Sequence, residues 1–276
     1  MHINYSRLNF YQICPRLYYW RFIENLAPQR SATPLIVGKS LHLGLAALYS
    51  GKNPNDFLNE TFVKVREQEA WLKPELEELD RQAAYVRYML EEYQRNYAKE
   101  PWTVLAPEVE GSIKMGEHQL HFRTDAIIEW RNALWLLEHK TTAQLGPSFF
   151  KKFVMDGQIT TYIYAVWGSL GTRPLGAVIN AIRKSFKLDR VAFERDVVLR
   201  SEAQINEFIE QACRQCNIIE RLQPVKEEYL MHTSQCVRYN RQCEFMELCL
   251  SDTPTARELY AKREPDYVDP EVAIDD

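Results

Sequence analysis

The sequence lacks a long apolar run, a signal peptide and an excess of positive charge. No apolar stretch approaches the roughly 20 residues of a membrane-spanning helix, which excludes a helical membrane protein. The first residues, MHINYSRLNFYQICPR, lack the apolar core of a secretory signal, so we expect a cytoplasmic protein. The net charge is −4, which excludes a polycation that coats nucleic acid, and any basic contact surface must therefore be local.

The composition is that of a globular protein of one sizeable core or two small ones. The chain has 276 residues, of which 46% are hydrophobic and 26% charged. It contains six cysteines. In a reducing compartment we expect these to be ligands, core residues or reactive thiols and not disulfides.

The apolar periodicity changes along the chain. Helical patterns fill residues 40–100, strand patterns fill 102–140, and a helix runs from about 153 to Gly171. Two further strands are expected at 174–185 and 190–200, and a helix at 202–222. This order predicts an α/β or α+β protein with a mixed sheet flanked by helices.

One hairpin carries charges that a purely structural strand would lack. The runs HFRTDAIIEW and ALWLLEHK are separated by Arg131-Asn132, which predicts an antiparallel pair. The pairing brings Asp125 near Glu138, and alternation places Glu138 and Lys140 on one face. Two carboxylates beside a lysine can hold a divalent metal and stabilise charge on a phosphate. The commoner explanation of such charges is a solvated edge or a salt bridge.

The cysteines suggest a tetrathiolate site. Cys236, Cys243 and Cys249 lie within 14 residues of one another without an apolar stripe to bury them. A fourth ligand would come from Cys14 or from the Cys213-Arg214-Gln215-Cys216 pair. That pair lies in a helical pattern in which Cys216 occupies an apolar position, so a core role is favoured there. Four thiolates suit zinc and an iron–sulfur cluster equally.

Taken together, these patterns resemble the PD-(D/E)XK nucleases, in particular their RecB-like iron–sulfur branch. This branch includes CRISPR-associated adaptation nucleases and the nuclease domains of bacterial helicase–nucleases. The similarity runs through nearly the whole chain. Its motifs are Ser6 with Cys14-Pro15-Arg16 and Tyr18-Tyr19, Gly38 with His42, Asp125, Glu138-His139-Lys140 with Thr141, Gln158 with Tyr162, and the cysteine triplet. There are two departures: Phe122 stands where the family often has glycine, and no G-x-x-x-x-G-K-[ST] motor motif is present.

The resemblance implies a role for each motif residue. Catalysis would rest on Lys140, Asp125, Glu138, Gln158 and Tyr162. Mg²⁺ or Mn²⁺ would bind Asp125, Glu138, the His139 backbone carbonyl and His42. A 4Fe–4S cluster would bind Cys14, Cys236, Cys243 and Cys249, and would tie the two ends of the chain together. Candidate DNA contacts are Arg16, Lys151 and Lys152, for which a solvated face is the alternative.

The resemblance also implies a domain plan and a function. Residues 1–252 would form a single nuclease domain with a helical insertion at about 50–100. Its iron–sulfur region would comprise about 1–30 and 229–252, followed by a tail at 253–276. The expected activity is a metal-dependent deoxyribonuclease, an exonuclease on single-stranded or end-processed DNA. Expected partners are DNA, a second copy, or proteins of DNA repair, recombination or CRISPR adaptation, with no membrane. The alternative is a non-catalytic or zinc-stabilised DNA-binding or scaffold protein that retains this fold.

Overall fold

Contacts between residues divide the chain into two units. The computed structural model describes residues 1–29, 33–68, 73–184, 191–238 and 241–263. The sheet unit comprises His2 and residues 32–213, and the terminal unit comprises Met1 with residues 3–31 and 214–276. β1 (His2–Ile3) has one residue in each, and α8 (Glu202–Arg221) has residues in both.

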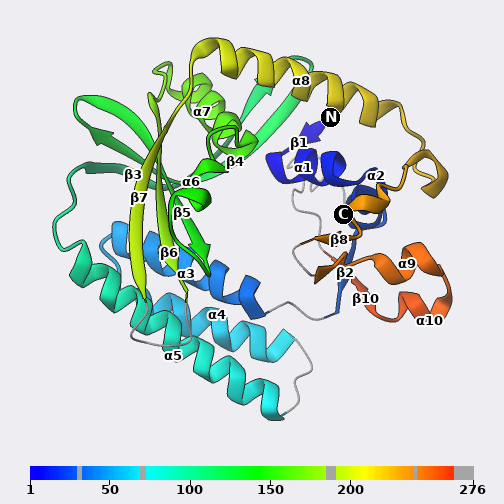
Figure 1. Ribbon diagram of the computed structural model, residues 1–276, viewed down its shortest axis with the longest axis horizontal. Coiled ribbons are helices and arrows are strands. Elements are labelled where there is room, and N and C mark those ends of the chain that lie inside the picture. The colour runs from blue at the N-terminus through cyan, green and yellow to red at the C-terminus, as the bar shows by residue number, and fades with distance from the viewer. Residues whose placement is uncertain (30–32, 69–72, 185–190, 239–240, 264–276) are drawn as a thin grey trace, which may run out of the picture. The chain divides into compact units, whose positions relative to one another are not determined.

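A mixed sheet forms the centre of the sheet unit, as the sequence predicts (Figure 1). Besides the short β1, which neighbours β4, its strands are β3 (Thr103–Met115), β4 (His118–Trp130), β5 (Ala133–Thr142), β6 (Gly176–Arg183) and β7 (Ala192–Leu199). They lie in the order β3-β4-β5-β6-β7. Strands β5 and β6 are parallel, and the other neighbours are antiparallel.

The predicted hairpin is formed by β4 and β5. Arg131 and Asn132 have φ angles of 54° and 59°, the left-handed conformation of a type I′ turn, which matches the twist of paired strands. The register pairs Ala126 with Leu137. The next step along both strands therefore brings Asp125 alongside Glu138.

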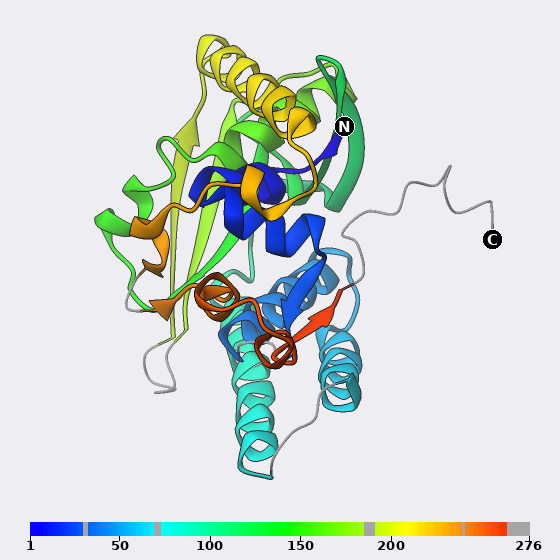
Figure 2. The same cartoon turned by 90° about the vertical axis from the view of Figure 1, so that its right-hand side faces the viewer.

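Helices pack against the sheet and one another. Apolar residues of α3 (Thr33–Tyr49), α4 (Pro54–Gln68) and α5 (Lys73–Asn96) form one core cluster that includes Ile182 of β6. In Figures 1 and 2 these three helices lie together at one end of the strands. None of the described helices is both long enough and apolar enough to cross a bilayer.

The connection between β5 and β6 carries two further helices, where the sequence predicts one. α6 (Pro147–Lys151) precedes α7 (Gly157–Leu170), so the predicted start near residue 153 is wrong. The Asp156 side chain accepts a hydrogen bond from Ile159 N and begins α7 at the following residue. The predicted end at Gly171 is correct, and that glycine has a φ of 69°.

The two faces of β5 meet different helices. Leu137 and Val178 belong to an apolar cluster against which Tyr49 of α3 packs. Glu138 and Lys140 project from the opposite face because side chains alternate, and Lys140 reaches α7. Lys140 and Glu138 thus lie on the face of β5 from which Lys140 contacts α7.

The terminal unit is built from short elements around an aromatic core. Tyr18, Trp20, Tyr229 and Phe245 are each no more than 1% exposed. The elements are α1 (Tyr5–Ile13), α2 (Pro15–Tyr18), η1 (Tyr19–Ile23), β2 (Leu26–Pro28), η3 (Lys226–Glu228), η4 (Thr233–Gln235), β8 (Val237–Arg238), β9 (Arg241–Gln242), α9 (Met246–Leu250), α10 (Pro254–Arg257) and β10 (Tyr260–Lys262). Strand β10 pairs with β2, so part of the expected tail at 253–276 has regular structure.

Candidate active site

Asp125 lies where β4 meets α3 and β5. Its Oδ1 is 3.0 Å from Nδ1 of His42 on α3, and its Oδ2 accepts a 2.7 Å hydrogen bond from the backbone N–H of His139. Both oxygens of this carboxylate are therefore held by residues distant in sequence, His42 at 83 positions and His139 at 14 positions. His42 and Asp125, two candidates from separate motifs, are neighbours.

Glu138, Lys140, Gln158 and Tyr162 form a connected chain of hydrogen bonds. Lys140 Nζ donates to Glu138 Oε1 at 2.7 Å and to Gln158 Oε1 at 2.6 Å. The Gln158 amide nitrogen then donates to the Tyr162 hydroxyl at 3.0 Å. Gln158 and Tyr162 are one helical turn apart on α7, so they present one face to the lysine. The lysine ammonium is thereby held at a defined position.

The charges at this site depend on their neighbours. Burial alone would raise the pKa of Asp125, but His42 and His139 together outweigh burial and lower the pKa. Burial raises the pKa of Glu138 to about 7, with Lys140 opposing the rise and Asp125 adding to it. Burial would lower the pKa of Lys140, but Glu138 keeps it above its ordinary value. The site thus contains a carboxylate that stays charged, a carboxyl that resists ionisation, and a charged ammonium.

The donor chemistry suits a divalent cation. Asp125 and Glu138 are near enough for the charge of one to raise the pKa of the other, a repulsion that a bound cation relieves. Both carboxylates are hydrogen-bonded to protein groups. Within the described parts of the chain, no group of three or more His, Cys, Asp or Glu side chains has the arrangement of a metal site. Lys140 donates to Oε1 of Glu138, so an ion bound through that oxygen would compete with Lys140 for it.

The His139 side chain lies on the opposite side of β5, in a buried polar network that the sequence reasoning missed. Its Nδ1 is 2.7 Å from Nδ2 of Asn180, and its ring stacks on Tyr49 with 5.6 Å between centroids. Asn180 also donates to Tyr93 and accepts from Arg195, which is paired with Glu100. Burial lowers the pKa of His139 to about 3, so its imidazole is neutral. A signal was present: Asn180 is the polar residue of the otherwise apolar segment GAVINAI.

Two candidate DNA-binding lysines lie at the end of α6. Both lysines are exposed, and Lys152 Nζ lies 3.8 Å from the centroid of the Phe149 ring. Burial lowers the pKa of Lys152, and the positive charge of Lys140 lowers it further. Lys152 is therefore within electrostatic range of the candidate catalytic lysine.

The four candidate cluster cysteines come together in the terminal unit. Cys14, Cys236, Cys243 and Cys249 all line one small pocket. Backbone N–H of His232 donates to Cys14 Sγ at 3.3 Å, and Trp20 Nε1 donates to Cys249 Sγ at 3.3 Å. The rival Cys216, on α8, is buried, in agreement with its predicted core role.

Arg16 lies beside this pocket. Its Nε donates to Tyr229 O at 2.9 Å, and its backbone N–H donates to Leu230 O at 3.1 Å. Burial raises the pKa of Cys249, and the positive charge of Arg16 opposes that rise. The contacts of Arg16 thus join the start of the chain to the segment before the cysteine triplet.

Known proteins place this arrangement in a family. The family model described as "PD-(D/E)XK nuclease superfamily" matches residues 2–250. A solved structure of a "Putative exonuclease" from Eubacterium rectale has a TM-score of 0.51 and 13% identity, over 95% of this chain and 94% of that one. The structure of SSO0001 has a TM-score of 0.31 and 15% identity, over 58% of this chain and 84% of that one. No curated protein matches the sequence. The chain belongs to the PD-(D/E)XK nuclease superfamily.

Proposed function

We propose that the protein is a Mg²⁺- or Mn²⁺-dependent deoxyribonuclease that acts as an exonuclease on single-stranded DNA or DNA ends. Its family membership supports hydrolysis of phosphodiester bonds. The observation that carries the proposal is the position of Lys140, held between Glu138 and Gln158 near the partly buried Asp125. The name of the Eubacterium rectale neighbour is consistent with the exonuclease mode.

Asp125, Glu138, His42 and the His139 carbonyl would hold the divalent ion. Carboxylate and carbonyl oxygens are the ligands that Mg²⁺ prefers, and the imidazole of His42 would favour Mn²⁺. Bound there, the ion supplies Lewis-acid chemistry, lowering the pKa of water and offsetting negative charge on the phosphate. In the unbound protein His42 orients Asp125 through the 3.0 Å contact.

Lys140 would stabilise the extra negative charge that develops on the phosphate during cleavage. Its ammonium remains protonated, and Gln158 keeps it in place through a 2.6 Å hydrogen bond. A preorganised charge of this kind needs no rearrangement at the moment of reaction, which is why it is effective. Tyr162 would act through Gln158, whose amide it accepts from.

We further propose that Cys14, Cys236, Cys243 and Cys249 bind a 4Fe–4S cluster. Two findings support this: all four line one pocket, and two of their sulfurs already accept N–H hydrogen bonds. Within the described residues these thiols do not yet have the spacing of a metal site, so cluster binding would draw them together. A zinc site of the same four ligands is the alternative, and metal analysis separates the two.

The second candidate function is a DNA-binding or scaffold protein without catalysis. Such a protein could lose the lysine or a carboxylate at no cost. The retained and interconnected Asp125, Glu138 and Lys140 favour catalysis.

The test is digestion of 5′- and 3′-end-labelled DNA, single- and double-stranded, by anaerobically purified protein with Mg²⁺ or Mn²⁺. We expect progressive shortening from an end, no cleavage with a chelator, and a loss of about 10²-fold or more in Lys140→Ala. Lys64→Ala, an exposed lysine on α4, is the matched control and should cleave as the parent does. Full activity in purified Lys140→Ala, or no cleavage of any substrate by the parent, would overturn the proposal.

A further inference from the structure

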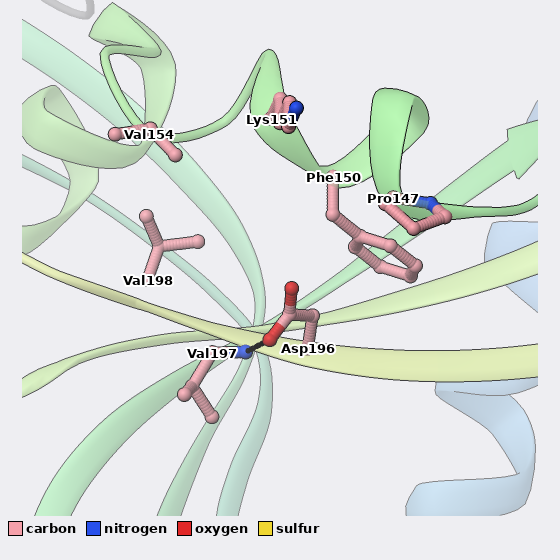
Figure 3. A pocket seen from close by; sticks show the side chains of 7 residues that line it. All are labelled: Pro147, Phe150, Lys151, Val154, Asp196, Val197 and Val198. Carbon is pink, nitrogen blue, oxygen red and sulfur yellow. Dashed lines mark hydrogen bonds between the residues drawn. The ribbon is translucent and has the colours of Figure 1, made fainter.

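A pocket of about 260 Å³ lies between α6 and strand β7 in the sheet unit (Figure 3). Pro147, Phe150 and Lys151 of α6 line one side with Val154, and residues 196–198 of β7 line the other. In Figure 3 the Phe150 ring extends from α6 toward β7, and the Asp196 side chain extends from β7 toward α6. The pocket is smaller than the roughly 300–1,000 Å³ that drug-sized ligands occupy. Its size suits a single small ring system.

The two walls of this pocket are held at a fixed separation by Arg200. This arginine, only 4% exposed, follows β7 directly. Its guanidinium donates to Phe153 O at 2.8 Å, to Asp156 O at 3.2 Å and to Thr160 Oγ1 at 2.9 Å. One buried cation therefore ties the end of β7 to the turn between α6 and α7. The pocket is formed before any ligand arrives.

The same turn joins the pocket to the candidate catalytic lysine. Asp156 ends the turn and caps α7, whose second residue is Gln158, the hydrogen-bond partner of Lys140. Lys152, the neighbour of the pocket residue Lys151, feels the charge of Lys140. One turn of the chain therefore joins the pocket residues of α6 to the helix that holds Lys140 in place.

The pocket presents three kinds of surface. Val154 and Val197 are 55% and 44% exposed, so apolar surface is open to a ligand. Phe150 adds an aromatic ring, and Lys151 adds a positive charge on the α6 side. Asp196 adds a carboxylate, one oxygen of which accepts the Val197 N–H at 2.8 Å. A phosphate is disfavoured beside Asp196 and favoured beside Lys151. A nucleotide with its base in the pocket and its phosphate at Lys151 satisfies both.

We propose that this pocket binds one unstacked base of the single-stranded DNA substrate next to the site of cleavage. The inference rests on the proposed nuclease function and adds a preference to it. Phe150 supplies stacking or edge contact, which is open to every base. Asp196 accepts hydrogen bonds and so favours the exocyclic amino groups of cytosine, adenine and guanine over thymine, which has none. The substrate class is therefore single-stranded DNA with an amino-bearing base, and not thymine, at one position.

The test measures binding of dC, dA and dT oligonucleotides of equal length by fluorescence anisotropy. Lys140→Ala is the parent, so that binding is read without cleavage. The parent should bind dC and dA about fivefold or more tighter than dT. Adding Phe150→Ala should weaken binding of all three by about fivefold or more. Adding Asp196→Ala should bring the dC-to-dT ratio to about one while dT binding is kept or improved, because a negative charge is removed.

Leu170→Ala is the matched control, an exposed apolar residue on α7 away from the pocket, and should leave every affinity unchanged. An oligonucleotide with 5-iodocytosine should also photo-crosslink to α6 or β7, as mapped by mass spectrometry. Equal parental affinities for dC, dA and dT would overturn the proposal, and so would an unchanged dC-to-dT affinity ratio in the Asp196→Ala variant. The proposal would also fail if the pocket were shown to bind a protein segment in place of a base. Base preference without cleavage by the wild type would contradict only the proposed nuclease function. Cleavage without base preference would contradict only the proposed role of the pocket.

Discussion

Removal of Glu100 should destabilise the sheet unit more than any surface charge does. Arg195 donates two hydrogen bonds to Glu100, at 2.7 and 2.8 Å, and the Tyr49 hydroxyl donates another at 2.8 Å. The side chains of the ion pair are only 14% and 17% exposed. Glu100→Ala therefore leaves a largely desolvated guanidinium without its counter-charge.

The magnitude follows from what Arg195 loses and keeps. Breaking a fully buried ion pair by removing one partner costs about 3–5 kcal/mol. Arg195 keeps its contact with the Tyr97 ring, 3.3 Å from the centroid, and its hydrogen bonds to Asn180 and Tyr93. We therefore expect Glu100→Ala to lower the free energy of unfolding by about 2–3 kcal/mol. For a unit of this size, that loss lowers the melting temperature by roughly 5–10 °C.

The assay is thermal unfolding followed by circular dichroism, with a double-mutant cycle through Arg195→Met. The double variant should lose less stability than the sum of the losses in the two single variants, because it no longer contains an uncompensated cation. Glu60→Ala, which breaks the exposed pair with Lys64, is the control and should leave the melting temperature unchanged. A Glu100→Ala protein that melts with the wild type would refute the account of this network.

Two other substitutions give sharp expectations. Gly176→Ala should destabilise the protein by several kcal/mol in denaturant unfolding, because an added Cβ would lie 2.1 Å from Val198 O. Gly38→Ala is the control and should be tolerated, since its Cβ would meet Thr141 Oγ1 at 3.7 Å. Equal stabilities of the two variants would contradict this prediction. Cys243→Ser should lose the brown colour and the bound iron of anaerobically purified protein, whereas Cys213→Ser should keep both. Stoichiometric zinc without iron in the wild type would replace the iron–sulfur proposal.

The hairpin and its charges could be predicted because their determinants are local. Arg131-Asn132 between two apolar runs predicts the turn, and the alternation of a strand places Glu138 and Lys140 on one face. The approach of Asp125 to Glu138 then follows from the register. The meeting of Gln158 with Lys140 needed the spacing of a known family, since nothing local links the two.

The polar network behind His139 could not be derived in the same way. Its hydrogen-bonded partners lie 15 to 102 positions apart, and their meeting depends on how α5 and β7 pack against β5 and β6. The separation of α6 from α7 was also missed, because the apolar pattern continues through Phe153 into the helix. Asp156, a capping residue inside that pattern, was the evidence for the break.

The central claim is that Asp125 and Glu138 together hold a divalent ion beside Lys140. The most direct test is the anomalous difference map of crystals soaked in Mn²⁺. We predict one strong peak within coordination distance of both carboxylates, absent in Asp125→Asn crystals prepared the same way. A wild-type map with no peak there, or with manganese bound only elsewhere, would contradict the account.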